Sequence, residues 1–375
     1  MARIGRSLEE LAREIERRAE TKRDFIAPTQ KMSMGLDESG KKPLLTIANG
    51  NIMTFGMQDM AHGQVAEYTD IPMAYYRRMM EQDPALLATN VNQWLHKKVG
   101  AKDGRRMVRT LDGQVRAVLS DKYRALEHED LAEAVLPVLL DMNLMFLSCE
   151  ITDRRLYIKC VDRSIERDVP TGRKMGDGTH VFFDTVSPAI TISNSEVGSG
   201  ALSIETGVYT RVCTNLAMIG SNLRKYHTGA RASVSDEVMA LLTDETKKAT
   251  DKAVWMQVRD MVTSAFDVAK FDALAKRVGD ASGDVIESDD VVQVIERVGK
   301  RFTLTEGERK GVLSRLIEGG DLTRYGVHAA ITRHSADADD YDRASTLERI
   351  GGDVIELAPG DWRELSGTKR LALAA

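Results

Sequence analysis

The alternation of apolar and polar positions predicts helices at both ends of the chain and β-hairpins in its middle. The charged pattern that follows the capping box Ser7-Leu8-Glu9-Glu10 predicts an exposed first helix. The polar stretch that continues to Lys42 predicts a loop. Residues 43–56 predict two short strands around an Asn-Gly-Asn turn, and residues 71–98 predict helices broken at Pro84.

The first strong hairpin signal is Asp112-Gly113, a two-residue turn between Met107–Leu111 and Gln114–Ser120. Simple pairing across this turn places Arg109 directly opposite Arg116. Like charges that face each other across a strand pair are unfavourable without a counter-ion. The two arginines therefore either meet a polyanion, or extend into water or pair with acids on a neighbouring strand.

A second hairpin follows a helix expected over residues 128–141 and pairs Met145–Ile151 with Leu156–Val161. Alternation assigns one face to the core, with Leu147, Cys149, Ile151, Leu156, Ile158 and Cys160. The opposite face carries Arg155, Tyr157 and Lys159. Cations that neutralise phosphates beside a ring that stacks on bases are what a single-strand binder needs, although a tyrosine between cations is also common on plain exposed sheets.

The remainder of the chain predicts more strands and then helices. The strands are expected at Val181–Phe183, Ala189–Ser193, Ala201–Glu205 and Tyr209–Cys213. A helical pattern begins near Ser235, and Ser235 and Ser288 are candidate N-caps. The pairs Gly319-Gly320 and Gly351-Gly352 are candidate helix stops.

Length and composition are those of a folded α+β protein with a central antiparallel β-hairpin sheet, packed helices and a helical C-terminal region. The chain has 375 residues, of which 42% are hydrophobic and 29% charged. We expect an N-terminal helix and loop over 1–42, an α+β core with basic hairpins over 43–231, and an acidic helical region over 232–375.

Several classes of protein are disfavoured by the sequence. The most apolar stretch, Leu131 to Cys149, is interrupted by Glu133, Pro137 and Asp141, so it predicts a core helix and a strand and not a membrane span. The N-terminus has no apolar segment typical of a signal peptide. Three cysteines without a C-x-x-C pair favour a reducing compartment. We therefore expect the cytoplasm of a bacterium or of a phage-infected cell.

The net charge of −5 is unevenly distributed. Residues 97–231 carry a net charge of +3 and residues 232–375 carry −7, while the segment 97–124 alone carries +6. Residues 206–231 contain four basic side chains and no acidic one. A basic strand-rich middle beside an acidic helical end favours a polyanionic partner, although a solvated charged face gives the same pattern.

Motifs that carry bond chemistry are missing, so we expect no catalytic residue, no metal and no cofactor. Gly198-Ser199-Gly200 opens no helix and is interpreted as a tight turn. Cys213 has only His227 as a nearby base and is interpreted as a buried structural cysteine. The stretch Asn194-Ser195-Glu196 is either a polar site or a satisfied strand end. A metal-dependent nuclease is the alternative enzyme, with Glu150, Asp153, Glu196 or Glu205 as its carboxylates.

Four stretches together resemble a phage/plasmid-like protein family known only as a domain of unknown function, number 932. Asn90–Leu95 and the run Arg106–Arg124 carry the resemblance, and the run is its most specific part. Ser193–Gly200 with Val212–Asn215 and the C-terminal Gly326–Thr332 with Tyr341–Ala344 extend it over roughly residues 60–355. Leu216-Ala217 departs from it, because many relatives are expected to have a glycine there.

The resemblance implies residence on a mobile element and supplies no catalytic residues. The order of hairpins, helix and helical tail is similar to single-strand annealing proteins of the RecT, Erf and Redβ kind, which form rings or filaments around single strands. This is an analogy of architecture, and a fold does not determine a function.

The leading expectation is a homo-oligomeric single-stranded DNA-binding protein, with strand annealing in recombination as a further expectation. A nuclease and a phage structural or scaffolding protein are the alternatives. The candidate nucleic-acid-binding residues are Arg105, Arg106, Arg109, Arg116, Lys122, Arg124, Arg155, Tyr157, Lys159, Arg211, Arg224 and Lys225.

Overall fold

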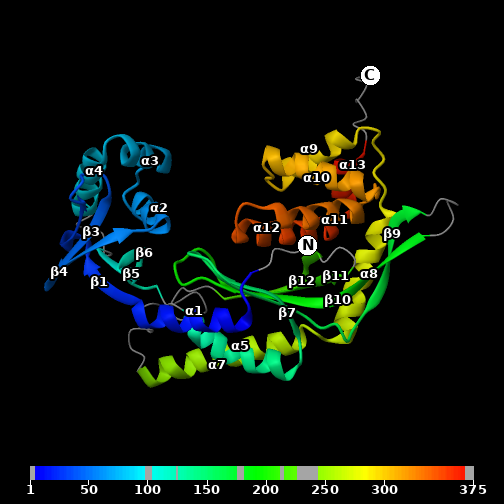
Figure 1. The fold of residues 1–375 in the computed structure, drawn as a ribbon, viewed down its shortest axis with the longest axis horizontal. Coiled ribbons are helices and arrows are strands. Elements are labelled where there is room, and N and C mark those ends of the chain that lie inside the picture. The colour runs from blue at the N-terminus through cyan, green and yellow to red at the C-terminus, as the bar shows by residue number, and fades with distance from the viewer. Residues whose placement is uncertain are drawn as a thin grey trace.

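The computed structural model confirms the α+β class, with helices packed around two six-stranded sheets. It describes residues 5–97, 104–123, 126–174, 181–211, 215–225 and 244–367. Seen along the shortest axis, the first sheet and its helices lie at one end of the long axis (Figure 1). The second sheet lies between helices below it and the C-terminal helices above it. None of the described helices is both long and apolar enough to cross a membrane.

The first sheet and three helices form what we call the N-terminal lobe. Its strand order is β1-β5-β6-β4-β3-β2, in which only β4 and β6 are a parallel pair. Its core is built from alternate strand residues such as Leu45 and Ile47 and from helix residues such as Leu87 and Val91. The strands are β1 (Arg23–Pro28), β2 (Met32–Leu36), β3 (Pro43–Asn49), β4 (Asn51–Met57), β5 (Arg105–Leu111) and β6 (Gln114–Ser120). The helices are α2 (Asp59–Tyr68), α3 (Met73–Gln82) and α4 (Pro84–Lys97).

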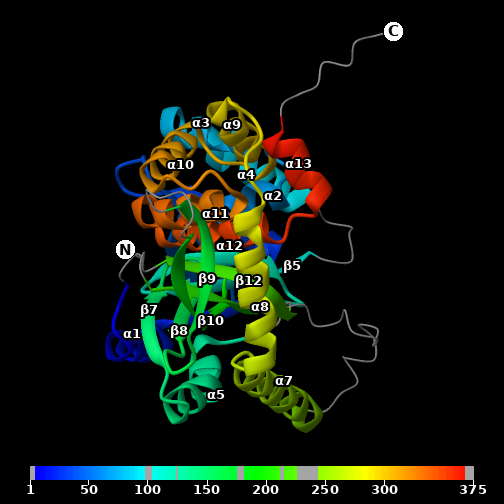
Figure 2. The same cartoon turned by 90° about the vertical axis from the view of Figure 1, so that its right-hand side faces the viewer.

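The second sheet has the order β12-β11-β10-β8-β7, and β9 pairs with the first part of β10. One face packs on α1 (Leu8–Thr21), α5 (His128–Asp141) and α7 (Asp244–Ser264). The other face packs on α8 (Val268–Asp280), α11 (Arg324–His334) and α12 (Tyr341–Ile355), as the side view also shows (Figure 2). The strands are β7 (Met145–Ile151), β8 (Leu156–Val161), β9 (Arg167–Lys174), β10 (Val181–Asn194), β11 (Leu202–Thr210) and β12 (Asn215–Lys225).

The C-terminal helices have a core of their own, which includes Val298, Leu316, Leu347 and Trp362. This core joins α11 and α12 to three further helices. These are α9 (Val291–Arg301), α10 (Glu306–Gly319) and α13 (Pro359–Ser366). Three short 3-10 segments complete the described helices, at Thr29–Lys31, Ala281–Gly283 and Ser335–Asp337.

Many expected elements are confirmed. Ser7 and Glu10 form both hydrogen bonds of the capping box of α1. The hairpins β3–β4, β5–β6 and β7–β8 lie where their turn residues predicted them, and α4 begins at Pro84, where a break between helices was expected. Helix α10 ends at Gly319, with Gly320 as a left-handed C-cap at φ 64°. These predictions succeed because caps and tight turns depend on local residue chemistry.

Other expectations are wrong. The expected loop before Lys42 contains β1 and β2, which pair with β5 and β3. The four expected strands after Val181 are two long ones, β10 and β11, because polar residues such as Ser187 and Thr191 are buried between helices and do not interrupt the strand. Residues 212–213, at the end of the last expected strand, lie outside the described residues, and so does the interpretation of Cys213 as a buried structural cysteine. Strand β9 was not predicted. The N-cap of α9 is Asp290, two residues after the expected Ser288, and Ser235 lies outside the described residues.

Gly351 and Gly352 lie inside α12 and do not end it. A Cβ atom at Gly352 would meet the main-chain oxygen of Met218 at 1.8 Å, and one at Gly351 would meet the Thr332 methyl at 2.4 Å. The glycines therefore permit α12 to approach β12 and α11 closely. Packing, and not helix termination, is the reason for this pair.

Candidate functional site

The β5–β6 hairpin has the predicted turn but not the predicted register. Asp112 and Gly113 both have positive φ, 52° and 73°, as a type I′ turn requires. The pairing then shifts between Arg109 and Thr110, so Arg109 lies opposite Ala117. Arg116 is the extra residue of a β-bulge. The expected face-to-face pair of Arg109 and Arg116 is therefore wrong.

Both arginines are nevertheless brought together, in the interior and against acids. Arg109 is 1% exposed and pairs through Nε with Asp24 at 2.9 Å and through Nη2 with Glu127 at 2.6 Å. Arg116 is 3% exposed and donates from Nη1 to Glu196 at 2.6 Å. Because Asp24 lies on β1 beside β5, pairing with an acid of a neighbouring strand is confirmed for Arg109.

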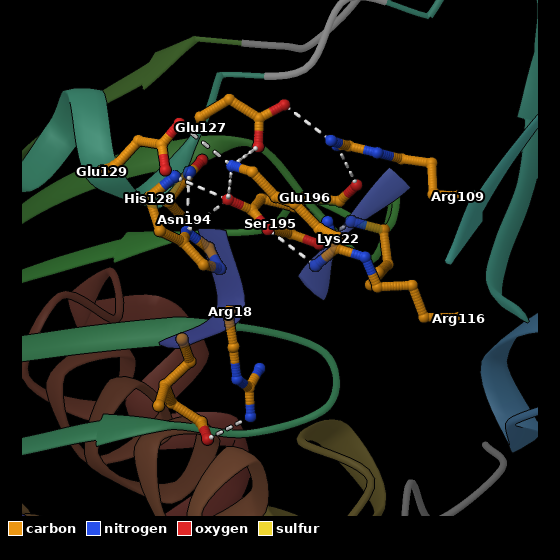
Figure 3. A network of polar contacts seen from close by, with 12 residues as sticks. Arg18, Lys22, Arg109, Arg116, Glu127, His128, Glu129, Asn194, Ser195 and Glu196 are labelled. Carbon is orange, nitrogen blue, oxygen red and sulfur yellow. Dashed lines mark hydrogen bonds and ion pairs between the residues drawn. The ribbon is translucent and has the colours of Figure 1, made fainter. Parts of the chain in front are cut away.

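Five residues at the contact of the two sheets form what we call the junction cluster: Lys22, Arg109, Arg116, Glu127 and Glu196 (Figure 3). Lys22 places its Nζ 2.8 Å from Glu127 and 3.9 Å from Glu196. Arg109 also donates from Nη1 to the main-chain oxygen of Glu196. The cluster joins the end of α1, the hairpin β5–β6, the start of α5 and the segment after β10.

Asn194, Ser195 and Glu196 form a buried strand end held by hydrogen bonds, in which the Oδ1 of Asn194 has no partner in the described part of the chain. The side chain of Asn194 donates to the main-chain oxygen of Leu126 at 2.7 Å, and the Ser195 hydroxyl accepts from two later main-chain N–H groups. Glu196 accepts from the main-chain N–H of His128 at 2.7 Å. All three side chains are at most 3% exposed. Of the two interpretations of this stretch, the structural one fits the geometry.

The two carboxyl groups of the junction cluster have opposite pKa shifts. Burial and the negative charge of Glu196 raise the pKa of Glu127 above its usual range. Burial alone would raise the pKa of Glu196 as well, but the positive charge of Arg116 and the hydrogen bond from the main-chain N–H of His128 hold it well below the usual range. Burial also lowers the pKa of His128 to about 4. Asp24, Glu127 and Glu196 pair with the two arginines of the cluster, so neither arginine is free to bind phosphate, although the buried Nε and Nη2 of Arg116 have no partner in the described part of the chain.

The expected open face of the β7–β8 hairpin is covered by α12, and the prediction that it is exposed is wrong. Tyr157 donates its hydroxyl proton to Asp342 at 2.8 Å, and the Nζ of Lys159 lies 2.6 Å from Glu348. Both side chains are at most 4% exposed. The half-buried Arg155 donates from Nη2 to Ser193 and to the main-chain oxygen of Ala201. The partners come from far along the chain, so no strand pattern could reveal them.

The apolar face of the same hairpin is confirmed except at Leu147. A register shift between Phe146 and Ser148 turns Leu147 to the opposite face, where it packs near Val161 and Tyr209. Phe146 packs on the core of the helix-covered face in its place. As in β5–β6, one bulge residue reverses the alternation that sequence reasoning assumes.

The other candidate residues are scattered. Arg105 and Lys122 are exposed and Arg106 is partly exposed, all three on the N-terminal lobe or directly after it. Arg211 pairs with Glu166 at 3.3 Å on the second sheet. Arg124 lies outside the described residues. Arg224 and Lys225 belong to β12, but their side chains lie outside the described part of the chain.

The acids of the nuclease hypothesis are not gathered in one place. Glu150 pairs with Arg6 at 2.6 Å, and Glu205 pairs with Arg349 at 2.8 Å. Glu196 belongs to the junction cluster. Across the described ranges, no three His, Cys, Asp or Glu side chains are placed to hold one metal ion.

Sequence reasoning missed a pocket on the N-terminal lobe, which we call the aromatic pocket. Its volume is about 370 Å³, and two large rings at its rim remain open, Tyr75 at 46% and Trp94 at 43% exposed. Asn90 precedes Trp94 by four residues, so the two share one face of α4. The lining residues are Thr69, Asp70, Ile71, Pro72, Tyr75, Asn90 and Trp94.

Cations lie against the rings in and beside this pocket. The Nζ of Lys97 is 5.0 Å from the ring centre of Trp94. The guanidinium of Arg106 lies 3.9 Å from the ring centre of Tyr68, the residue before the pocket wall begins. Trp94 gives no sequence signal of its exposure, because it follows Leu87 by seven residues and Val91 by three, which is the spacing of the apolar stripe of α4.

Comparisons with known proteins add no relative: no family model, no curated protein and no solved structure matches the chain. The resemblance to the phage/plasmid-like family rests on sequence motifs and stays a prediction.

Proposed function

We propose that the chain binds single-stranded DNA through the aromatic pocket of the N-terminal lobe. The observation that carries the proposal is the pair of open rings, Tyr75 and Trp94, at the rim of one pocket with cations beside it. Proteins that hold single strands combine rings, on which bases stack, with cations that follow the phosphates. The pocket has both parts on one surface.

The bases supply the contact that double-stranded DNA cannot make. In a duplex the faces of the bases are already stacked, whereas a single strand can place a base between Tyr75 and Trp94. Asn90 and Asp70 line the same pocket, beside the position that a stacked base would take. We therefore expect a preference for single strands over duplexes.

The phosphates are expected to meet Lys97, Arg105 and Arg106. Arg105 is exposed and directly precedes Arg106 at the start of β5, and the guanidinium of Arg106 covers the ring of Tyr68. This places the electrostatic contact at the start of β5. The sequence pointed instead to two hairpin faces that carry Arg109, Arg116 and Lys159. Those three side chains are paired with acids, namely Asp24, Glu127, Glu196 and Glu348, and are not part of the proposed surface.

The test is equilibrium binding of a labelled thymidine oligonucleotide at about 50 mM salt. Because each stacked base contributes about 1–3 kcal/mol, Tyr75→Ala and Trp94→Ala should each weaken binding by about 5- to 150-fold. Ile52→Ala is the matched control, since Ile52 is 78% exposed on strand β4 of the same lobe. Absence of any binding by the wild type, or wild-type affinity in the double variant, would overturn the proposal.

A further inference from the structure

The β9–β10 hairpin presents two phenylalanines to solvent. Phe182 is 40% and Phe183 is 59% exposed, at a point where the pairing of β10 with β9 shifts register. The hairpin extends beyond the helices at one end of the molecule (Figure 1). Two cations accompany the rings: the Arg173 guanidinium lies 5.4 Å from the ring centre of Phe182, and Lys174 is exposed. An apolar knob with basic flanks is a feature of contact surfaces.

A groove of matching character runs between α5 and α7. It consists of two hollows of about 480 and 470 Å³ that share Met256 and Arg259. Met256 is 56% exposed, and Val138 and Met142 line the same groove. Methionines adapt their shape to an inserted ring and make favourable contacts with it. The remaining charged lining residues are Asp130, Glu133, Asp141, Lys252 and Asp260.

The two surfaces are complementary in size and in charge. A cavity of about 150 Å³ holds a benzene molecule, so each hollow has room for a phenylalanine ring. The groove carries four acids and two cations among its lining residues, which leaves it net negative. On the hairpin, Arg173 pairs with Asp184 at 3.2 Å, so the exposed Lys174 is the cation that this arm presents. Opposite potentials favour one docking orientation over others.

The two surfaces cannot meet within one chain. In both views of the fold, the end of β9 at Lys174 and the start of β10 at Val181 lie away from α5 and α7 (Figures 1 and 2). The hairpin that fills a groove must therefore belong to another copy.

We infer that the β9–β10 hairpin of one copy inserts Phe182 and Phe183 into the α5–α7 groove of the next copy. Such a contact joins two different surfaces, so every copy keeps one free hairpin and one free groove. It therefore builds a ring if the rotation closes and a filament if it does not. This contact would be the interface of the expected homo-oligomer, and its formation does not depend on DNA binding.

Sedimentation velocity without nucleic acid measures the assembly. We expect wild-type oligomers at micromolar concentration that dissociate to monomers in Phe182→Ser/Phe183→Ser and, separately, in Met256→Glu. The control is Ile52→Ser, an exposed apolar residue on the N-terminal lobe that should leave the oligomer intact. A monomeric wild type, or oligomers that survive both variants with unchanged circular dichroism, would overturn the inference.

Disulfide trapping distinguishes this contact from a symmetric one. A chain with Phe183→Cys is mixed with a chain with Met256→Cys under mild oxidation, and each is also oxidised alone. We expect a disulfide-linked dimer chiefly in the mixture, whereas cross-links formed by the Phe183→Cys chain alone would show a hairpin-to-hairpin contact and refute the groove. Cys149 and Cys160 are buried, and the wild type oxidised alone measures any background from native cysteines.

Discussion

At the scale of single residues, a positive charge and an available positive charge are different properties. Arg109, Arg116 and Lys159 are basic residues on strands, which is why the sequence points to them as phosphate ligands. The structure pairs each with a carboxylate at 2.6 Å. Those carboxylates come from other elements, so only the tertiary fold shows that the charges are satisfied. Arg105, at the exposed start of the same strand as Arg109, stays available.

Glu196 is the residue on which the junction cluster depends most. Glu196→Gln should lower the free energy of unfolding by about 3–5 kcal/mol, because it leaves Arg116 buried without its counter-ion. Glu9→Gln is the control, since the Glu9 side chain is 84% exposed. Urea unfolding of both variants measures the difference. A loss for Glu196→Gln no larger than that of the control would show that the cluster does not hold the two sheets together.

A buried histidine makes stability depend on pH in a predictable direction. Burial lowers the pKa of His328 to about 4, and its Nδ1–H donates to the main-chain oxygen of Gly351 at 2.8 Å. Between pH 6.5 and about 4, His328 is protonated in the unfolded chain but stays neutral in the folded chain. The free energy of unfolding therefore falls as the pH drops from about 6.5 to about 4. His328→Asn, whose amide can replace the donor, should reduce this slope by up to about 1.4 kcal/mol per pH unit. Unfolding free energies that keep the wild-type slope in His328→Asn would contradict the assignment.

At the scale of elements, a glycine can allow two elements to pack closely together as well as end a helix. Gly352→Ala should destabilise the protein by several kcal/mol, because the added Cβ would overlap the main chain of β12 at Met218. Gly307→Ala is the matched control: Gly307 lies in α10 with nothing within 4 Å of an added Cβ, and alanine there should be neutral or stabilise by up to about 1 kcal/mol. Thermal unfolding of the pair checks both signs. Equal effects of the two substitutions would refute the packing role of Gly352.

The elements also show which parts of the fold can be predicted from the sequence. Asp112-Gly113, Ser7 with Glu10, and Gly320 each act through bonds to their near neighbours, and each prediction succeeded. The bulges at Arg116 and Leu147 left no local mark, since a single extra residue looks like any other in an alternating strand. The pairing of β1 with β5, residues far apart in the chain, was equally hidden.

At the scale of the whole molecule, the C-terminal helices decide which surface is open. Helix α12 covers Tyr157 and Lys159, so the face expected to bind DNA lies inside the protein. The aromatic pocket lies on the lobe that these helices do not cover (Figure 1). The sequence could supply the class of residue needed, rings beside cations, but not the surface on which such residues remain free.

The electrostatic part of binding has a signature in the salt dependence. For single strands the slope of log K against log salt concentration is about −0.7 per neutralised phosphate. Arg105→Gln together with Arg106→Gln should therefore flatten the slope by about 1.4. Lys300→Gln with Lys310→Gln, on exposed positions of α9 and α10, should leave it unchanged. An equal change in both double variants would mean that net charge, and not this surface, sets the affinity.

The site of contact can be measured directly by photocrosslinking. An oligonucleotide with 4-thiothymidine is irradiated on the wild-type protein, and the attached peptides are identified by mass spectrometry. The structure predicts crosslinks within α3 and α4, at Tyr75 and Trp94 above all, that disappear when unlabelled single strands compete. Competed crosslinks on the second sheet or the C-terminal helices, with none in α3 or α4, would contradict the account.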